Sequence, residues 1–332
     1  WEYGRLQVTN TVLSKRKLLK LRDEGAVSAL DDPRLYTLPA LRRRGVPPQA
    51  INNFARELGV TTADTTIEVV RLENHIRDAL NETAPRIMAA LHPVRVVLEN
   101  LPADHLEEIE LAYMPRNDVL GKRRVPFTRA LYIDASDFRE VDSADYYRLA
   151  PGKTVGLNGV EHPITCTSVR RDAAGAVTEL VCRYENAGGH AKPSAFIQWV
   201  ADCPERGSPV RLDEVRIYKP LFKHANPTDK TVVPGGWLTD VDHDSLEVVR
   251  GAVADIRLWD IIRQFAATEA GAQELRKGNH EGVRVQFMRI GYFALDKDAV
   301  LPPAALAGGR ADDAKLVLNR TVTLKEDAKK EA

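Results

Sequence analysis

The hydrophobic pattern of the chain changes its period at Pro93. Before this residue, apolar side chains recur at the spacing of an α-helix. After it, short segments rich in β-branched and aromatic residues alternate apolar with polar positions, as half-buried strands do. Since one segment cannot satisfy both periods, the chain is predicted to have an α+β fold in which a small helical bundle precedes a β-rich part.

Helix boundaries before Pro93 are marked by residues that commonly begin and end helices. Ser14 is placed to cap a first helix and Gly25 to end it, and Gly59 ends a helix whose apolar stripe contains Phe54. The connections are brief, which favours a bundle. The expected helices cover residues 14–24, 39–41, 49–58, 66–80 and 86–91, and one more is expected among the strands at 257–276.

The β-rich part is divided by loops that carry Gly, Pro, Asn and Asp. Many short strands with such turns are typical of sandwiches and barrels, and this part is long enough for two barrels. The expected strands are 94–100, 125–134, 164–171, 177–185, 195–202, 210–222, 246–255, 283–296 and 316–324.

The charges balance, with 47 basic and 47 acidic residues. A protein that binds nucleic acid mainly through a basic surface would carry an excess of positive charge. An RNA partner is still compatible with neutrality, provided that the contact depends on shape and base reading as much as on charge. No apolar run approaches the ~20 residues of a membrane span, and no secretory signal opens the chain, so we expect no membrane partner.

Cysteine and histidine spacing argues against a metal site. The three cysteines, Cys166, Cys182 and Cys203, form no CxxC pair, and the eight histidines do not cluster. We therefore expect free thiols in a reducing, cytoplasmic compartment. Cys166 and Cys182 lie symmetrically about a turn, so they are expected opposite each other in a hairpin.

Two basic segments in the helical part each allow two interpretations. Residues 12–18 (VLSKRKL) place lysines at a helix start, which is compatible with phosphate binding, although such a segment is more often a solvated face. The arginines of residues 40–45 (ALRRRG) are compatible with RNA backbone contact. The alternative, which we favour, is that at least one of them pairs with Asp31, Asp32 or Glu57.

Basic and aromatic residues also recur on the expected strands. Arg and Gln can hydrogen-bond to unpaired bases and Tyr can stack on them, whereas the alternative is ordinary solvent-facing polar residues. Alternation places Gln286 and Arg289 on opposite faces of one strand. The strand segments are YYRL (146–149), VQFMRIGYF (285–293) and LNRTVTL (318–324). A separate segment, NETAPR (81–86), has the residues of a helix cap.

The segment TVLSKRKLLKL (11–21) resembles the second signature loop of class I aminoacyl-tRNA synthetases, usually written KMSKS. Further segments follow in the order seen in glutaminyl-tRNA synthetases of the eukaryotic type. They include DDPRLYTLPALRRRGVPPQAINNFARELGVT (31–61), TIEVVRLENHIRDALNETAPRIMAALHPVRVVLEN (66–100) and VPGGWLTD (233–240). The resemblance extends over nearly the whole chain, and glutamyl-tRNA synthetases, which share the signature loop, remain the near alternative.

This resemblance implies a division into domains. Residues 1–20 would end a class I catalytic domain and 21–93 would form a helical connector. A proximal anticodon-binding β-barrel would use 94–131 and 201–324, a distal one 132–200, and 325–332 would be a charged tail. Because the sequence has no HIGH-type motif, we expect a C-terminal fragment that lacks the catalytic Rossmann domain and is inactive alone.

The resemblance also implies roles for individual residues. Lys15 would be the catalytic lysine that steadies the ATP phosphates, with Ser14 and Arg16 beside it. Gly156 and Asn158 stand where bacterial members carry arginines, which leaves open how the first anticodon base is read. The positions that match anticodon contacts are Asn81, Arg86, Tyr146, Arg148, Gln286 and Arg289.

The function implied is that of a glutamine–tRNA ligase, which uses ATP with Mg²⁺ to join glutamine to tRNA(Gln). The fragment would read the anticodon and supply the ATP loop, and by itself would hold no cofactor. We expect a cytoplasmic monomer that is compatible with membership of a multi-synthetase complex. The alternatives are a glutamyl-tRNA synthetase fragment and a non-catalytic tRNA-binding or scaffold module.

Overall fold

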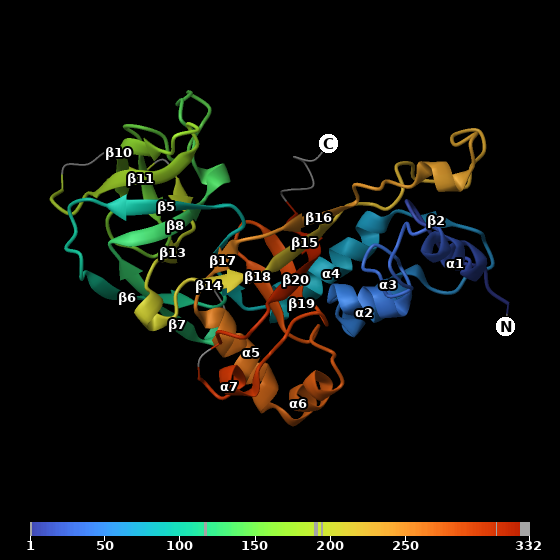
Figure 1. Ribbon diagram of the computed structural model, residues 1–332. Helices are drawn as coiled ribbons and strands as arrows, with labels where there is room; N and C mark the ends of the chain where they lie inside the picture. The colour runs from blue at the N-terminus through green and yellow to red at the C-terminus, as the bar shows by residue number, and fades with distance from the viewer. Residues whose placement is uncertain (1, 116–117, 189–191, 194, 310, 326–332) are drawn as a thin grey trace.

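The computed structural model describes residues 2–115, 118–188, 192–193, 195–309 and 311–325. N-terminal helices, a six-stranded sheet and a seven-stranded sheet follow one another across the molecule (Figure 1). The fold is a mixture of helices and curled sheets in which most helices precede most strands. The change of period at Pro93 therefore predicts the class of the fold.

The helical region packs around apolar faces with the expected spacing. Phe54 and Ile76 are buried in its core, and Thr37 caps one helix by accepting a hydrogen bond from the Ala40 N–H at 3.2 Å. The expected helix at 66–80 begins later because Thr66–Ile67 pairs as a strand with Gln7–Val8. The elements are β1 (Gln7–Val8), α1 (Lys15–Asp23), α2 (Leu38–Arg44), α3 (Pro48–Leu58), β2 (Thr66–Ile67) and α4 (Val69–Thr83).

The six-stranded sheet occupies the middle of the molecule (Figure 1). Its order is β16 (Leu246–Val249), β15 (Glu214–Tyr218), β20 (Val317–Thr323), β19 (Gly291–Leu295), β18 (Arg284–Phe287) and β3 (Arg86–Ile87). A smaller sheet joins β14 (Val210–Leu212), β17 (Ala252–Ala254) and β4 (Ala89–Ala90). The prediction of a helix at 86–91 is wrong, because these residues pair with β18 and β17 instead.

Two further predictions in this region are corrected by the structure. The expected helix at 257–276 is two helices, since Thr268 is extended and its hydroxyl accepts the Gly271 N–H at 3.0 Å. The expected strand at 283–296 is a hairpin whose turn contains Arg289, with a φ of 67°. The helices of this region are α5 (Arg257–Ala267), α6 (Glu269–Arg276) and α7 (Pro303–Leu306).

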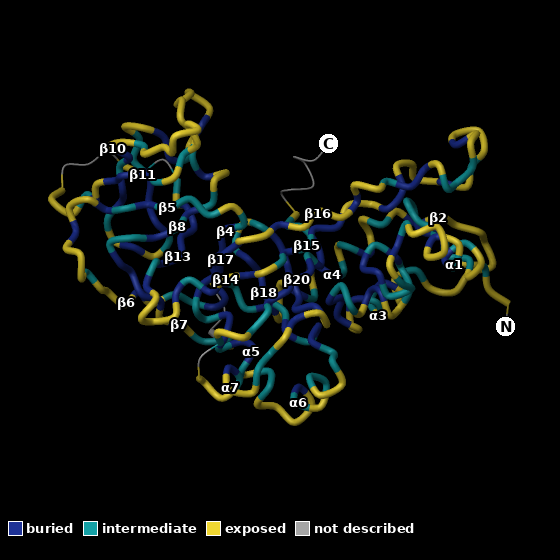
Figure 2. Tube along the Cα trace, in the orientation of Figure 1, coloured by how far each residue is buried: buried dark blue, intermediate teal, exposed yellow. Residues whose placement is uncertain are grey.

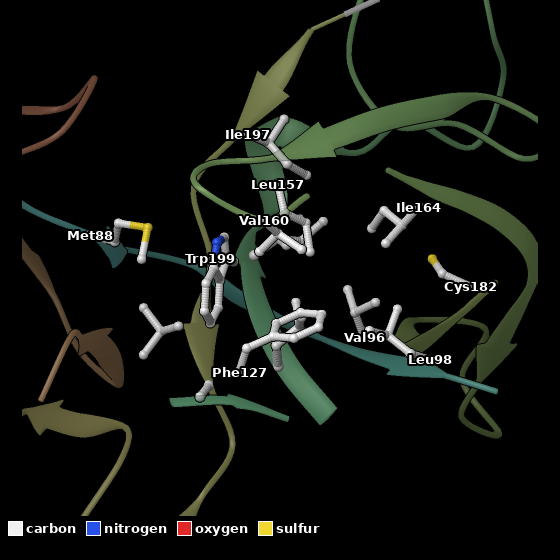
Figure 3. Close-up of a cluster of buried hydrophobic side chains, with 14 of the residues drawn as sticks. Met88, Val96, Leu98, Phe127, Leu157, Val160, Ile164, Cys182, Ile197 and Trp199 are labelled. Carbon is white, nitrogen blue, oxygen red and sulfur yellow. The ribbon is translucent and has the colours of Figure 1, made fainter. Parts of the chain in front are cut away.

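The seven-stranded sheet and a neighbouring hairpin enclose a large apolar core. Trp199 and Phe127 meet there edge to face, with 5.4 Å between ring centroids, and Met88 lies near Trp199 (Figure 3). The sheet order is β12 (Phe196–Ile197), β9 (Thr154–Leu157), β10 (Ile164–Arg171), β11 (Val177–Tyr184), β5 (Pro93–Leu98), β8 (Ala130–Asp134) and β13 (Val200–Ala201). The hairpin is β6 (Leu106–Ala112) with β7 (Lys122–Thr128).

Within residues 94–131, the strands that the structure describes lie outside the six-stranded sheet. Strand β5 pairs with β11 and β8 of the seven-stranded sheet, and Phe127 and Leu131 are buried in the same core.

Short 3₁₀ turns lie at Asp118–Leu120, Ala135–Asp137, Pro204–Arg206 and Trp237–Asp240.

A long excursion between β15 and β16 reaches the N-terminal helices (Figure 1). The Asn10 side chain donates to the Phe222 carbonyl at 3.1 Å, and Phe222 and Val241 are buried together with Leu18 and Leu21. Buried residues thus continue from the sheets into the helical region, whereas loop tips are exposed (Figure 2). In the described part of the chain, no helix is both long and apolar enough to cross a membrane.

Candidate nucleic-acid interface

Three of the predicted anticodon residues meet where β3 pairs with β18. Arg86 and Gln286 are partners in the parallel register, and Arg86 Nη2 donates to Asn81 Oδ1 at 2.8 Å. The Tyr292 hydroxyl donates to the same oxygen at 3.3 Å. We call Asn81, Arg86, Gln286 and Tyr292 the β3–β18 cluster.

The β3–β18 cluster contains polar atoms that lack partners. Arg86 Nε and Gln286 Oε1 are both buried without a hydrogen bond within the described residues. An unpaired buried donor or acceptor costs about 1–3 kcal/mol, so such atoms are uncommon. A donor and an acceptor at one sheet edge are suited to a ligand that offers both, as the edge of a base does.

Two other predicted residues, Arg148 and Arg289, converge on Asp137. Arg148 Nη1 lies 3.1 Å and Arg289 Nη2 3.0 Å from the same carboxylate oxygen. Burial raises the pKa of Asp137, and the two arginines offset part of that rise. About a third of each arginine side chain stays exposed, at 30% and 35%. We call these three residues the Asp137 cluster.

The Asp137 cluster lines a cleft between the two large sheets. The cleft has a volume of about 330 Å³ and receives Gln198 and Arg148 from one side and Met288 and Arg289 from the other. Gln198 is buried, and its Oε1 has no hydrogen-bond partner in the described chain. Since Arg289 is in the turn that follows Gln286, the cleft and the β3–β18 cluster are adjacent along one hairpin.

The sixth predicted anticodon residue, Tyr146, is buried. The guanidinium carbon of Arg139 lies 4.5 Å from its ring centroid, and burial raises the pKa of its hydroxyl. Its neighbour Tyr147 is 62% exposed. In this conformation, therefore, Tyr147 presents a ring to solvent and Tyr146 does not.

Gly156 lies in β9 and Asn158 in the turn that follows it, so neither position offers a charged side chain. Asn158 accepts a hydrogen bond from the Trp199 indole at 3.0 Å through its carbonyl oxygen. A Cβ at Gly156 would lie 2.4 Å from two ring carbons of Phe196. The backbones of Gly156 and Asn158 therefore contact the large side chains of Phe196 and Trp199.

The signature-loop residues lie at the start of α1. Ser14 occupies the N-cap position, but its side chain makes no capping hydrogen bond, while Lys15 and Arg16 are exposed. A small cavity of about 80 Å³ beside them is lined by Arg5, Ser14 and Lys17 and by residues of the β15–β16 excursion. Partial burial, together with the charges of Arg5 and Arg16, lowers the pKa of Lys17.

The run of arginines at 42–44 makes intramolecular contacts. Arg43 Nε lies 3.0 Å from Asp296 and its Nη1 lies 3.7 Å from Asp31, which confirms the prediction of a structural ion pair with one of three acidic residues. Arg42 pairs with Glu274 at 2.5 Å, and Arg44 donates to the Thr321 carbonyl at 2.9 Å.

The cysteines are buried and free. Cys166 and Cys182 are direct partners across the β10–β11 hairpin, which confirms their expected placement. Within the described ranges, no three His, Cys, Asp or Glu side chains are arranged to hold a metal ion.

Sequence reasoning missed Asp137, Gln198 and Phe196. Asp137 follows a strand and has no local signal, because its partners are far away in the sequence. Gln198 and Phe196 fall in an expected strand whose polar and apolar positions are, in fact, partly inverted: the glutamine is buried and the phenylalanine is 60% exposed. Only the packing of the two sheets could identify these residues.

Two family profiles match the chain. Residues 1–82 match the catalytic domain and residues 84–185 the anti-codon binding domain of "tRNA synthetases class I (E and Q)".

Curated relatives match almost the whole chain. It is 41% identical to the probable glutamine–tRNA ligase of Schizosaccharomyces pombe over 99% of its length and 39% of the relative. It is 40% identical to the glutamine–tRNA ligase of Saccharomyces cerevisiae over 99% of its length and 40% of the relative. The Bos taurus glutamine–tRNA ligase is 43% identical over 98% of this chain and 37% of the relative. The chain thus spans about two fifths of these proteins.

Proposed function

Because the chain belongs to the class I tRNA synthetases for glutamate and glutamine, we propose that it serves glutamine–tRNA ligation by reading the anticodon of tRNA(Gln) and supplying a loop to the ATP site. The observation that carries this proposal is the gathering of sequence-distant polar residues into the β3–β18 and Asp137 clusters. Both clusters hold partly exposed guanidinium groups, and the first also holds buried atoms without partners.

In this proposal the two curled sheets are the anticodon-binding barrels. The six-stranded sheet would be the core of the proximal barrel and the seven-stranded sheet that of the distal barrel. Because β5 and β8 are hydrogen-bonded to the strands of the seven-stranded sheet, we assign them to the distal barrel. The anticodon loop would then lie across the cleft where the two sheets adjoin.

The clusters supply complementary chemistry to unpaired bases. Arg86 and Gln286 hold a buried donor and a buried acceptor in neighbouring strands, and the edge of one base could pair with them if it displaced the groups that cover them. Arg148 and Arg289 offer donors held in place by Asp137, so less rotamer entropy is lost when they bind. Tyr146 would contribute by packing beneath this surface, since its ring is covered by Arg139.

The signature loop is proposed to act on ATP. Lys15, with Ser14 and Arg16, would bind the phosphate oxygens of ATP, which carries its own Mg²⁺. In the ligation, the glutamine carboxylate attacks the α-phosphorus, pyrophosphate leaves, and the terminal ribose hydroxyl of the tRNA then displaces AMP. Lys15 would stabilise the negative charge that develops on the phosphates.

Localisation and assembly follow the same proposal. We place the protein in the cytoplasm, as the name of its Arabidopsis thaliana relative states for that enzyme. A monomer is sufficient, because both clusters come from a single chain. Association with other synthetases is compatible with the exposed surfaces of α3 and α6.

The proposal is tested by measuring the affinity of the chain for tRNA(Gln) and for the same tRNA with its middle anticodon U changed to A, at one fixed salt concentration. We expect the change to weaken binding by about 5-fold to 150-fold, the range for loss of one specific base contact. Equal affinity for both tRNAs would mean that the protein binds shape or backbone alone, and the anticodon-reading function would be wrong.

A further inference from the structure

Phe196 is an aromatic residue that its own fold leaves uncovered. It is 60% exposed, although phenylalanine is among the residue types most often buried. It begins β12, an edge strand of the seven-stranded sheet, whereas its neighbours Ile197 and Trp199 are fully buried. Packing of the sheet therefore does not account for an aromatic side chain at this position.

The ring of Phe196 is nevertheless held in place. Strand β12 pairs with β9 so that Phe196 lies opposite Gly156, and a Cβ at Gly156 would come within 2.4 Å of the ring carbons Cδ1 and Cε1. Any side chain at position 156 would displace the ring. One side of the ring thus rests on the backbone of Gly156, while 60% of the residue stays exposed.

The backbone of Phe196 contacts the cationic side of the cleft. Arg289 Nη1 lies 3.4 Å from the Phe196 carbonyl oxygen, and the same guanidinium is bound to Asp137. An exposed aromatic residue whose backbone contacts an arginine combines the two groups of a surface that binds single-stranded nucleic acid, where bases stack on rings and cations attract the backbone. A protein partner would instead be expected to cover a larger apolar patch.

We propose that Phe196 is a stacking platform for the first base of the anticodon, an inference that rests on the anticodon-reading function proposed above. Stacking uses the face of a base, which all four bases share, so it tolerates changes of sequence. Glutamine anticodons vary at their first base, while the other two bases are constant. A stacking contact would accept either base at this variable position, whereas an edge contact would reject one of them.

The test compares Phe196→Ala and Phe196→Trp with the unchanged chain. Dissociation constants are measured for tRNA(Gln) transcripts that carry U, C or an abasic nucleotide as the first anticodon residue. We expect Phe196→Ala to weaken binding of the U and C transcripts equally, by about 5-fold to 150-fold. Phe196→Trp should bind them as tightly as the unchanged chain does, since it keeps an aromatic ring. With the abasic transcript, Phe196→Ala should cause no further loss, because the stacking partner is already absent.

A matched control is Val141→Ala, which trims another exposed apolar residue, 80% exposed, in the loop after the Asp137 turn. It should leave every dissociation constant unchanged. The inference is overturned if Phe196→Ala binds as tightly as the unchanged chain, or if its loss persists with the abasic transcript. Failure of the proposed function itself has a different signature, since the unchanged chain would then bind equally to tRNAs with U or A in the middle position.

Discussion

Replacing Arg86 with alanine removes the guanidinium group of the β3–β18 cluster. Arg86 donates to Asn81 through Nη2, its Nε is buried without a partner, and its backbone pairs with that of Gln286. Because the side chain is only half-buried and one guanidinium nitrogen is already used internally, the fold should tolerate its loss. The effect is therefore expected in RNA binding and not in stability.

The magnitude follows from the atoms that remain available. With Nη2 held by Asn81 and Nε buried, the other amino group, Nη1, is left to donate to a base, and a hydrogen bond from a charged group contributes about 1.5–3 kcal/mol. Arg86→Ala should thus weaken binding of tRNA(Gln) by about 10-fold to 150-fold. The preference for the correct base should shrink by the same factor, since only the correct base makes the contact.

Titrations at several salt concentrations distinguish base reading from phosphate binding. Arg86→Lys keeps the charge but loses the planar fork, so we expect it to resemble Arg86→Ala in base preference while keeping the salt dependence. Arg276→Ala removes an equal charge from the exposed end of α6 and should have little effect. If Arg86→Ala weakens all tRNAs equally and lowers the salt slope by about one, Arg86 contacts phosphate and the base-reading role is refuted.

Three further predictions concern catalysis, stability and thiol chemistry. In a protein that joins this chain to a complete catalytic domain, Lys15→Ala should lower the kcat of glutamine-dependent ATP–pyrophosphate exchange by about 10²-fold to 10³-fold, whereas Lys20→Ala on the same helix should not. Burial opposes ionisation of Asp296, but hydrogen bonds from Arg43, the Asp298 N–H and Asn319, with the charge of Arg43, outweigh this and hold its pKa below the ordinary value. The ionised group therefore stabilises the fold above the unfolded pKa of about 3.9, and this contribution is lost as pH falls through the lower folded pKa. In urea unfolding at pH 7, Asp296→Asn should lower the free energy of unfolding by about 3–5 kcal/mol. A decrease of less than about 1 kcal/mol would contradict this. Burial raises the pKa of the Cys203 thiol to about 11, so alkylation by iodoacetamide at pH 8, followed by mass spectrometry, should be about a hundredfold slower in the native protein than in urea.

The class of the fold could be predicted because hydrophobic period is a local property. The expected helices at 14–24 and 49–58 correspond to α1 and α3, and the expected strands at 164–171 and 177–185 correspond to β10 and β11. The helix expected at 86–91 failed since its apolar residues suit either period. Pairing with β18 and β17, which lie far along the chain, decides that they form strands.

Prediction of the site was limited by the same long-range dependence. Resemblance singled out Arg148 and Arg289 one at a time, but their common partner Asp137 is 152 residues from Arg289 and carries no local signal. The hairpin turn at Arg289 was read as continuous strand, although no β-branched residue occupies its centre. Exposure of Phe196 and burial of Gln198 depend on how an edge strand ends against the other sheet, which alternation alone does not describe.

The Asp137 cluster links the neutral charge of the chain to base discrimination. Arg148 and Arg289 share one buried carboxylate, so an approaching phosphate meets two guanidinium groups of which half the charge is already compensated. Attraction to the backbone is therefore weaker than two free arginines would give, and discrimination depends on the guanidinium N–H groups that Asp137 leaves unused. A base with acceptors in matching positions can accept hydrogen bonds from these donors while Asp137 holds them in place. A base without such acceptors gains no hydrogen bond from either arginine, so the correct tRNA binds more tightly than the wrong one.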